Sequence, residues 1–492
     1  MPDDSRQITR ETIPMSKTGT ALVWFHRDLR LTDNPALSTA VEQCARVIPL
    51  YIHAPEEEAP WVPGSASNWW LHQSLRALQY DLRRYGSNLI IVKGPTLAIL
   101  QSLAHETGAT HLFWNRRYEP AFIARDSRIK RELTDSGLTC RSFNGNLLSE
   151  PASILTGQDT PYKVFTAYWK ACQKKAQALT PPLSHITRIP TPPQNHPNLD
   201  INTLDLLPRI KWYAGMEATW QPGEQGALDR WTRFLQNRLP DYEDQRDFPG
   251  SEGTSRLSPH LHFGEISPRQ ILWSLQQQSD QSPVLGRHLD RFTSQLGWRE
   301  FAHYTLHHFP HSANESLDRR FEKSAWPKGE EQEQLLGLWQ RGETGIPLVD
   351  AGMRELWHTG WMHNRVRMIV ASFLTKNLGI HWREGARWFW DTLVDADLAN
   401  NSLGWQWTAG CGVDAAPYFR VFNPARQAEH FDAGGYIQRW LPELKGADKA
   451  VLHNGRLDTD GPIDYPRPIV DLNQSRRAAL QRWERIKRLE RG

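Results

Sequence analysis

A change in hydrophobic pattern near residue 224 constrains the fold of this chain more than any other feature. Before about residue 150, short β-rich apolar runs alternate with helical stretches, and the runs lie at 21–26, 48–53, 88–94 and 110–115. This alternation predicts a parallel sheet with helices on both faces. After residue 224 the chain has helical periodicity and no strand alternation, which predicts an all-α domain.

The segment between these two patterns is polar and rich in proline. LTPPLSHITRIPTPPQNHPNLD is typical of a long connection, and PYKVFTAYWKAC predicts a short helix within it. The first residues are polar and lack an apolar core, so we expect a disordered extension and not a secretory signal. The predicted parts are an N-terminal extension (1–19), an α/β domain (20–149), an interdomain linker (150–223) and a helical domain (224–492).

The composition excludes several classes of protein. The chain has 492 residues, and its 58 basic and 55 acidic residues give a net charge of +3. Nucleic-acid binding therefore requires a local basic patch. The four cysteines (Cys44, Cys140, Cys172, Cys411) are widely spaced, which predicts a reduced intracellular protein without a zinc site or disulfide framework. No apolar run approaches the roughly 20 residues that a membrane span needs.

The stretch from Asp395 to Pro424 (DADLANNSLGWQWTAGCGVDAAPYFRVFNP) concentrates residues suited to chemistry. Trp405 and Trp407 are two residues apart, so on a helix they project about 200° apart. We expect one to face an aromatic cofactor inside the protein and the other a planar ligand outside. Asp395 and Asp397 are predicted to end a helix, where the dipole disfavours acids. They therefore require a specific partner. The alternatives are a ribityl hydroxyl, an arginine and a metal, of which the metal is the least favoured.

Two further groups combine polar and aromatic residues. In EGTSRLSPHLHFGEISP (252–268), hydroxyls surround Arg256 next to a helix start, which suits either a phosphate or plain N-capping. The Ser-Pro pairs at 258–259 and 267–268 predict that Ser258 and Ser267 are N-caps, each followed by a first-turn proline. Trp361, Asn364 and Met368 are predicted to share one face of a helix over 357–374. Methionine and tryptophan at such positions are more often core residues, but a buried amide needs partners.

Other candidates are more isolated. Gln295 and Trp298 are predicted to share a helix face, either as a core tryptophan with a polar neighbour or as part of a site. Arg246, Arg365 and Arg420 suit either ion pairs or a clamp on DNA phosphates.

These motifs together resemble the DNA photolyase/cryptochrome family over nearly the whole chain. The resemblance is carried by LVWFHRDLRLTDNPAL, TSRLSPHLHFGEISPRQ, GWREF, DAGMRELWHTGWMHNRVRM and NNSLGWQWTAGCGVDAAPYFRVFNP. The chain looks most like bacterial class III cyclobutane-pyrimidine-dimer photolyases, a branch close to plant cryptochromes. The resemblance implies a Rossmann-like α/β antenna domain and a helical domain that binds FAD.

The resemblance also implies roles for individual residues. Those implied to hold the FAD phosphates and ribityl chain are Tyr242, Thr254, Ser255, Arg256, Leu257 and Ser258. Those implied to surround the flavin are Trp361, Asn364, Arg367, Asp395, Asp397 and Asn401, with an Arg367–Asp395 ion pair. The implied electron chain is Trp405, Trp382 and Trp326, with Trp339, Trp388 and Trp390 as alternatives to Trp326. The implied DNA contacts are Trp298 and Trp407 as pocket walls, Met368 and Asn364 on the lesion, and Arg246, Arg365 and Arg420 on phosphates.

Gln295 departs from the family pattern. Cyclobutane-dimer photolyases usually carry a glutamate three residues before the tryptophan of GWREF. A glutamine still donates through its amide but cannot give up a proton, so we expect impaired but not absent repair. Six-four photolyases also have a glutamine at the position of Gln295, but they use a histidine where this chain has Asn364, so that lesion class is disfavoured. At the position of Asn401, plant cryptochromes usually carry Asp and animal ones Cys, so Asn401 favours a photolyase.

The antenna site departs as well. Ala121 and Phe122 replace the Asn-Glu pair that some photolyases use for methenyltetrahydrofolate, so we expect a folate-type chromophore to bind differently, as in the class III branch.

Two hypotheses of different classes follow. The first is a cytoplasmic, monomeric, blue-light-driven enzyme that repairs UV-damaged DNA and has no membrane partner. The second is a cryptochrome-like flavin photoreceptor with weak or no repair, which the lack of a long C-terminal tail disfavours. A flavoprotein with a purely structural role is a distant third.

Overall fold

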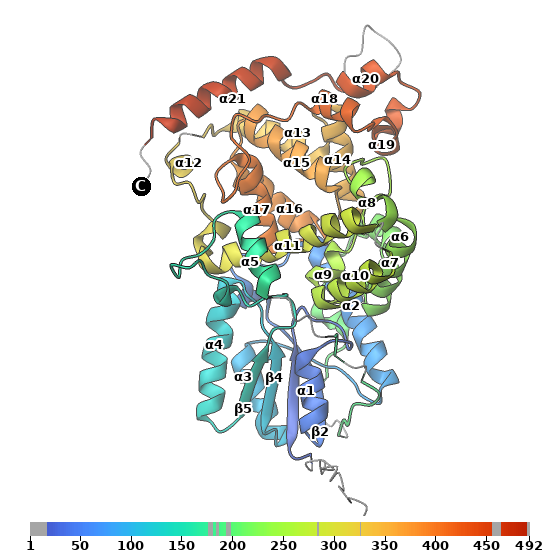
Figure 1. Ribbon diagram of the computed structural model, residues 1–492, viewed down its shortest axis with the longest axis vertical. Helices are drawn as coiled ribbons and strands as arrows, with labels where there is room; N and C mark the ends of the chain where they lie inside the picture. Colours follow the sequence, from blue (N-terminus) through green and yellow to red (C-terminus); the bar gives the residue numbers. More distant parts are fainter. Residues whose placement is uncertain are drawn as a thin grey trace, which may run out of the picture.

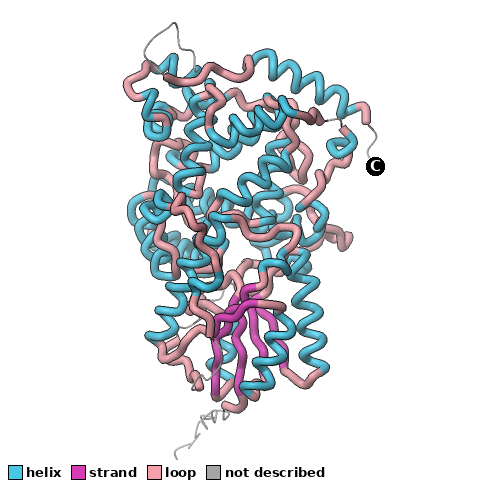
Figure 2. Tube along the Cα trace, turned by 180° about the vertical axis from the view of Figure 1, so that it is seen from behind, coloured by secondary structure: helices cyan, strands magenta, loops and turns pink. Residues whose placement is uncertain are grey.

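The computed structural model describes residues 17–175, 181–183, 186–192, 198–282, 285–324, 326–454 and 464–489. Most of the predicted N-terminal extension (residues 1–16) and parts of the predicted linker lie outside the described residues. The strands lie at one end of the molecule and most helices at the other (Figure 1). Seen from behind, the strands form one group beneath the helices (Figure 2).

Five parallel strands form one sheet in the order β3-β2-β1-β4-β5. Their bounds are β1 Thr20–Phe25, β2 Arg46–His53, β3 Ile90–Lys93, β4 His111–Asn115 and β5 Thr139–Phe143. The first four strands confirm the prediction. We did not predict β5, because this short edge strand is only partly buried and has no apolar run.

Four helices cover the sheet and explain the alternation in the sequence. They are α1 Pro35–Gln43, α2 Ser65–Arg84, α3 Thr96–Thr107 and α4 Pro120–Asp135. Side chains of β1 alternate between the two faces: Val23 shares a buried cluster with residues of α1 and α2, and Trp24 with residues of α3 and α4. All six residues of β1 are buried, as expected for a parallel sheet covered on both faces.

After β5 the described part of the chain forms helices and no further strand, which confirms the all-α prediction for the part after residue 224. The α-helices are α5 Phe165–Lys175, α6 Ala214–Thr219, α7 Glu224–Asn237, α8 Tyr242–Gln245, α9 Ser258–His262, α10 Pro268–Gln281, α11 Gly286–His308, α12 Arg320–Lys323, α13 Glu330–Arg341, α14 Pro347–Thr359, α15 Asn364–Ser372, α16 Trp382–Thr392, α17 Leu398–Ala409, α18 Pro424–His430, α19 Gly434–Trp440, α20 Lys449–Asn454 and α21 Leu472–Lys487. Shorter helices are η1 Pro55–Glu58, η2 Pro151–Ser153, η3 Ile201–Leu204, η4 Leu239–Asp241, η6 Pro310–Ala313, the π-helix η7 Phe373–Asn377 and η8 Pro442–Leu444. Within the described ranges, none of the helices combines the length and the apolar character that a membrane span requires.

Glu265 joins the two domains through a buried set of hydrogen bonds. Its Oε1 accepts from Trp70 Nε1 at 3.0 Å and Ser74 Oγ at 2.5 Å, both on α2, and from the Gly223 backbone N–H at 2.7 Å. Its Oε2 contacts His260 Nδ1 at 2.5 Å. Because these partners come from separate parts of the chain, the carboxylate fixes α2 against the helical domain.

A second buried carboxylate, Glu300 on α11, holds the segment that leaves β5. Its Oε2 accepts the backbone N–H groups of Leu148 at 2.8 Å and Ser149 at 3.2 Å. Burial raises the pKa of Glu300 from 4.5 to about 7, against the opposing effect of Arg299. The protonated carboxyl therefore stabilises the fold below pH 4.5, and this contribution is lost as the pH rises through about 7.

We predict that Glu300→Gln stabilises the protein at pH 8 but not at pH 4.5. The amide oxygen keeps an acceptor for Leu148 and Ser149, and the cost of ionising a buried carboxyl, on the order of 3 kcal/mol, disappears. Thermal unfolding measured between pH 4.5 and pH 8 checks this expectation. A variant that melts below the unaltered protein at pH 8 would contradict it. The control is Glu384→Gln on α16, where the side chain is 41% exposed, and this variant should show no such pH dependence.

Candidate functional site

Asp395 and Asp397 lie in the connection between α16 and α17. Asp397 is the N-cap of α17 and accepts the backbone N–H of Asn400 at 2.8 Å. The predicted position at the end of a helix was wrong, because α16 ends at Thr392, before both acids, and α17 begins at Leu398, after them. At a helix N-terminus the dipole favours a carboxylate. Although burial disfavours its charge, contacts with buried histidines and Asn400 hold the pKa of Asp397 well below its usual range.

Arg367 and Asp395 form the ion pair that the sequence predicted. Arg367 Nη1 and Nη2 donate to the two carboxylate oxygens at 3.1 and 2.8 Å, and Nε donates to the Met362 carbonyl at 2.8 Å. The Asp395 side chain is 4% exposed, whereas that of Arg367 is 24% exposed. The bidentate pair thus fixes one side of the guanidinium and leaves another side open.

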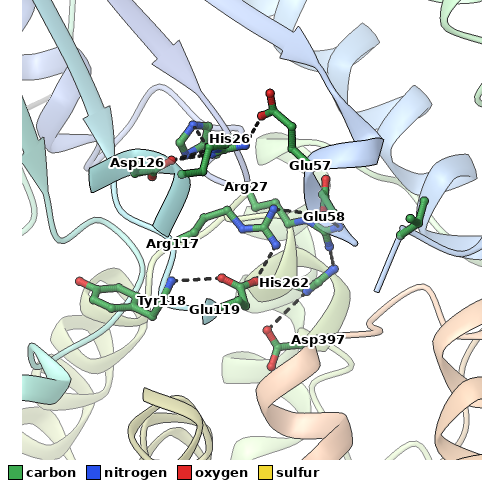
Figure 3. Close-up of polar contacts among 12 residues, drawn as sticks. His26, Arg27, Glu57, Glu58, Arg117, Tyr118, Glu119, Asp126, His262 and Asp397 are labelled. Atoms are coloured by element: carbon green, nitrogen blue, oxygen red, sulfur yellow. Dashed lines mark hydrogen bonds and ion pairs between the residues drawn. The ribbon is translucent and has the colours of Figure 1, made fainter. Parts of the chain in front are cut away.

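A buried network connects Asp397 with the α/β domain (Figure 3). Arg27 Nη1 donates to Nε2 of His262, so the ring proton is on Nδ1, which lies 3.8 Å from Asp397 Oδ2. Burial and Arg27 lower the pKa of His262 to about 4, which leaves the imidazole neutral near pH 7. His303 Nε2 lies 3.5 Å from the same carboxylate oxygen. One acid of α17 is thereby linked to α9, α11 and the end of β1.

His262 and Arg27 were not among the predicted site residues, although both lie in motifs that carry the family resemblance. Arg27 follows β1, which lies beside β4 where the strand order reverses. Ligand sites and polar clusters gather at such a switch point, so this position was a usable signal. Among the described residues, no group of three or more His, Cys, Asp or Glu side chains could hold a metal ion.

Trp361 is not on a helix with Asn364 and Met368, so the helix predicted over 357–374 was wrong. Gly360 adopts a left-handed conformation (φ +67°) and ends α14, and a Cβ there would lie 2.7 Å from Val394 Cγ1. Asn364 and Met368 do share a face of α15, with Asn364 Nδ2 3.9 Å from Met368 Sδ. The connection between α14 and α15 frees Trp361 to turn toward α9.

Trp361 meets the segment that precedes α9. Its Nε1 donates to Ser258 Oγ at 3.2 Å, and the guanidinium of Arg256 lies 4.7 Å from the centre of its ring. Arg256 itself has a positive φ of 52°. Ser258 was predicted as an N-cap, but Leu257 precedes the helix and makes no side-chain cap, so that prediction was wrong. The N-cap predicted at Ser267 is confirmed by a complete capping box.

Trp405 and Trp407 point in different directions, as predicted. Trp405 is 2% exposed and packs with Phe389 and Trp339 at ring distances of 5.0 and 6.2 Å. Trp407 is only partly buried. A Cβ on Gly385 of α16 would lie 2.0 Å from Trp405 Cη2, so the indole fits only because this position has no side chain.

Of the other two tryptophans of the implied electron chain, Trp382 begins α16 and Trp326 lies in the segment between α12 and α13. Trp382 is fully buried and its Nε1 donates to Ser316 Oγ at 2.9 Å. His381 stands between Trp326 and Trp382, with ring distances of 5.0 and 5.7 Å. Of the alternatives, Trp339 contacts Trp405 directly, whereas Trp388 stacks on Trp357 and Trp390 donates to the Val62 carbonyl.

The remaining predicted residues surround α11 and α15. Gln295 and Trp298 both lie on α11, and Trp298 stacks on Phe165 at 3.9 Å with ring planes 10° apart. Arg246 Nη2 donates to Gln295 Oε1 at 3.1 Å, and Arg365 pairs with Asp247 at 2.8 Å.

Arg420, Asn401 and Tyr242 complete this set. Arg420 is exposed, and its carbonyl accepts a hydrogen bond from Lys376 Nζ at 2.8 Å. Asn401 Nδ2 donates to the Ala386 carbonyl of α16 at 2.9 Å, and Tyr242 is buried at the start of α8.

Several of these polar side chains stay open although aromatic and apolar residues surround them. Ser258 and Asn364 are exposed, Thr254 and Ser255 are partly exposed, and Arg367 is open on one side. Hydroxyl, amide and guanidinium groups in this combination fit a ligand with phosphates, a polyol chain and a planar polar ring, which FAD has.

Comparison with known proteins agrees with this geometry. Residues 21–192 match the family model of DNA photolyase, and residues 292–485 match the FAD binding domain of DNA photolyase. A deoxyribodipyrimidine photo-lyase of Agrobacterium fabrum is 42% identical over 487 residues, which cover 96% of this chain and 99% of that protein. Cryptochrome-2 of Arabidopsis thaliana is 36% identical and covers 92% of this chain and 77% of its own. The crystal structure of a class III photolyase from Agrobacterium tumefaciens superposes with a TM-score of 0.90 at 41% identity, covering 97% of this chain and 100% of that one.

We predict that Gly385→Ala displaces Trp405 and destabilises the protein by roughly 1–3 kcal/mol, as overpacking does in other cores. The matched control is Gly404→Ala on α17, where an added Cβ meets nothing within 4 Å. That change should be neutral or stabilising, because alanine favours a helix by up to about 1 kcal/mol over glycine. Thermal unfolding and near-UV circular dichroism check both variants, and equal melting temperatures would contradict the packing argument.

Proposed function

This chain belongs to the DNA photolyase/cryptochrome family and carries its FAD-binding domain, and on this premise we propose that it is a blue-light-driven enzyme that repairs cyclobutane pyrimidine dimers in DNA. The observation that carries the proposal is one face of α15. Asn364, Arg367 and Met368 follow each other at i, i+3 and i+4, so they are neighbours on that face. The proposed dimer contacts thus lie beside the Arg367–Asp395 pair proposed to meet the flavin.

FAD fits the open polar side chains described above and supplies, when bound in its reduced form, the light-driven electron that opens the cyclobutane ring. We propose that its phosphates and ribityl chain are held by Tyr242, Thr254, Ser255, Arg256, Leu257 and Ser258. The residues proposed around the flavin ring are Trp361, Asn364, Arg367, Asp395, Asp397 and Asn401. Asp395 holds the guanidinium of Arg367 in place, so its positive charge and its donors have fixed positions beside the flavin ring. These groups therefore need no reorganisation during the reaction.

Trp298 and Trp407 are proposed to stack on a dimer flipped out of the duplex. Phe165 covers one face of Trp298, so the indole is supported from behind and has its other face for the lesion. Flipping costs a few kcal/mol and least for damaged bases, and stacking on aromatic rings returns roughly 1–3 kcal/mol per base. Arg246, Arg365 and Arg420 are proposed to hold the phosphates beside it.

Gln295 is proposed to donate its amide to the dimer. Its carbonyl oxygen accepts from Arg246 at 3.1 Å and its amide nitrogen donates to the Arg291 carbonyl at 3.4 Å, which orients the side chain and leaves the second amide hydrogen for the dimer. An amide cannot transfer a proton to the dimer, so repair proceeds more slowly than with a glutamate at this position.

Trp405, Trp382 and Trp326 are proposed to return the flavin to its reduced form by passing electrons from the surface. Ring contacts through His381 support Trp326 as the outer member, and the direct contact with Trp405 keeps Trp339 as the alternative.

A cryptochrome-like photoreceptor with weak or no repair is the second candidate. Two observations favour it, which are the identity of 36% with cryptochrome-2 of Arabidopsis thaliana and the presence of Gln295. For either function we propose a cytoplasmic monomer, and for the enzyme UV-damaged DNA as the partner, with a folate-type antenna chromophore bound away from Ala121 and Phe122.

We predict that the purified protein with reduced FAD removes thymine dimers from an oligonucleotide under blue light, measured by chromatography against a dark control. No loss of dimers above the dark control would leave the photoreceptor as the better candidate.

Gln295→Glu should repair faster by roughly one order of magnitude, because a proton donor is restored. Gln481→Glu, an exposed change on α21, should leave the rate unchanged; equal rates for both variants would refute the account of Gln295.

We predict that Trp405→Phe lowers photoreduction of the oxidised flavin to near the dark level, because phenylalanine is much harder to oxidise than tryptophan. Repair by the chemically reduced protein should persist. Absorbance of the flavin under blue light with an external reductant measures the first quantity. Trp231→Phe, which alters a tryptophan buried in a separate cluster, should photoreduce normally. Normal photoreduction in Trp405→Phe would remove this residue from the chain.

A further inference from the structure

Asp247 stands between two arginines that are proposed to bind DNA phosphates. It follows α8 in the turn QRDFP, and its side chain is 26% exposed. Its Oδ2 lies 2.8 Å from Arg365 Nη2, and its Oδ1 lies 3.6 Å from Arg246 Nε. One carboxylate is therefore shared by two guanidinium groups, which leaves this cluster with an excess of one positive charge.

The two arginines are held firmly by other contacts. The guanidinium of Arg365 lies 4.6 Å from the ring centre of Phe431, and that of Arg246 lies 5.5 Å from the ring centre of Tyr242. Their side chains are only 19% and 10% exposed. The arginines are therefore preorganised, and Asp247 sets the direction in which their donors point.

This carboxylate leaves much of the donor capacity unused. Nε and Nη1 of Arg246 and Nε of Arg365 are buried and have no hydrogen-bond partner within the described residues. Buried donors on a charged group are costly to leave unpaired. Asp247 alone therefore does not satisfy the two guanidinium groups. The parts of the two side chains that stay exposed, 10% for Arg246 and 19% for Arg365, are where an anion with more acceptors, such as a phosphate diester, can bind.

The cluster is also connected to the lesion contact. Arg246 uses its remaining nitrogen, Nη2, to hold the Gln295 carbonyl oxygen at 3.1 Å. A continuous series of contacts thus runs from the proposed dimer contact to the proposed phosphate contacts, through Gln295, Arg246, Asp247 and Arg365. Asp247 is at the centre of this series and is the acidic member.

We propose that Asp247 is a specificity-determining residue that favours binding of dimer-containing DNA over undamaged DNA. Undamaged DNA binds through net charge and tolerates varied orientations of the cations, so a carboxylate beside the arginines weakens this binding. The flipped dimer brings its phosphates to defined positions, so this complex gains from the arginine orientation that Asp247 imposes. The same charge therefore acts in opposite directions on the two complexes, which is how discrimination against a competitor arises. The inference rests on the proposed function, because it requires a lesion complex.

The test compares affinities of the FAD-loaded protein in the dark for a duplex with one thymine dimer and for the same duplex without it. Fluorescence anisotropy at several salt concentrations gives both values. Asp247→Asn should bind undamaged DNA roughly tenfold more tightly and with a salt slope steeper by about one. Its affinity for the dimer duplex should be unchanged or lower, so the ratio of affinities falls. Asp247→Glu, which keeps the charge, should restore most of the ratio.

Asp244→Asn is the matched control. Asp244 lies three residues earlier and pairs at 2.6 Å with Arg287, and both side chains are at least half exposed. It makes the same change in net charge, so it should raise both affinities alike and preserve the ratio. An Asp247→Asn variant that behaves like this control, or that lowers both affinities together with the melting temperature, overturns the inference. Equal affinity of the unaltered protein for both duplexes overturns the proposed function as well, which separates the two failures.

Discussion

The buried carboxylate of Asp397 is the constraint on which the helical domain and its junction with the α/β domain depend. A charge removed from water must be compensated by several polar partners. The carboxylate of Asp397 lies at the positive N-terminal end of α17 and accepts hydrogen bonds from amides of that helix. Nδ1 of His262 on α9 and Nε2 of His303 on α11 lie beside the same carboxylate. Arg27 then extends this set of contacts into the α/β domain. Four distant parts of the chain must assemble correctly before this one charge is stabilised.

The same connection places the residues that are proposed to act on the flavin. Because α16 ends before Asp395 and α17 begins after Asp397, both acids leave the helical backbone and turn toward different partners. Asp395 turns to Arg367 on α15, and Asp397 turns to the histidines. Trp405 on the following helix packs directly onto the position of Gly385, so the break in the helix and the tryptophan contact belong to a single packing arrangement.

Features that depend on local pattern were predictable from the sequence. Apolar runs predicted β1 to β4, and the spacing of Trp405 and Trp407 predicted one buried and one open side chain. The edge strand β5 was missed because an edge needs no apolar run. The helix breaks were missed because Asp395 to Asp397 and Gly360 stand in segments whose hydrophobic pattern continues across them. Contacts such as Arg27 with His262 join residues more than 200 positions apart, and no pattern within one segment encodes them.

The contact between Arg27 and His262 has a consequence for the inheritance of the two domains. In this protein the guanidinium that fixes the tautomer of His262, beside the buried Asp397, belongs to the α/β domain. A substitution at this junction in one domain therefore changes which residues the other domain can tolerate there. We expect the two domains to evolve as one unit, with recombination within the linker disfavoured.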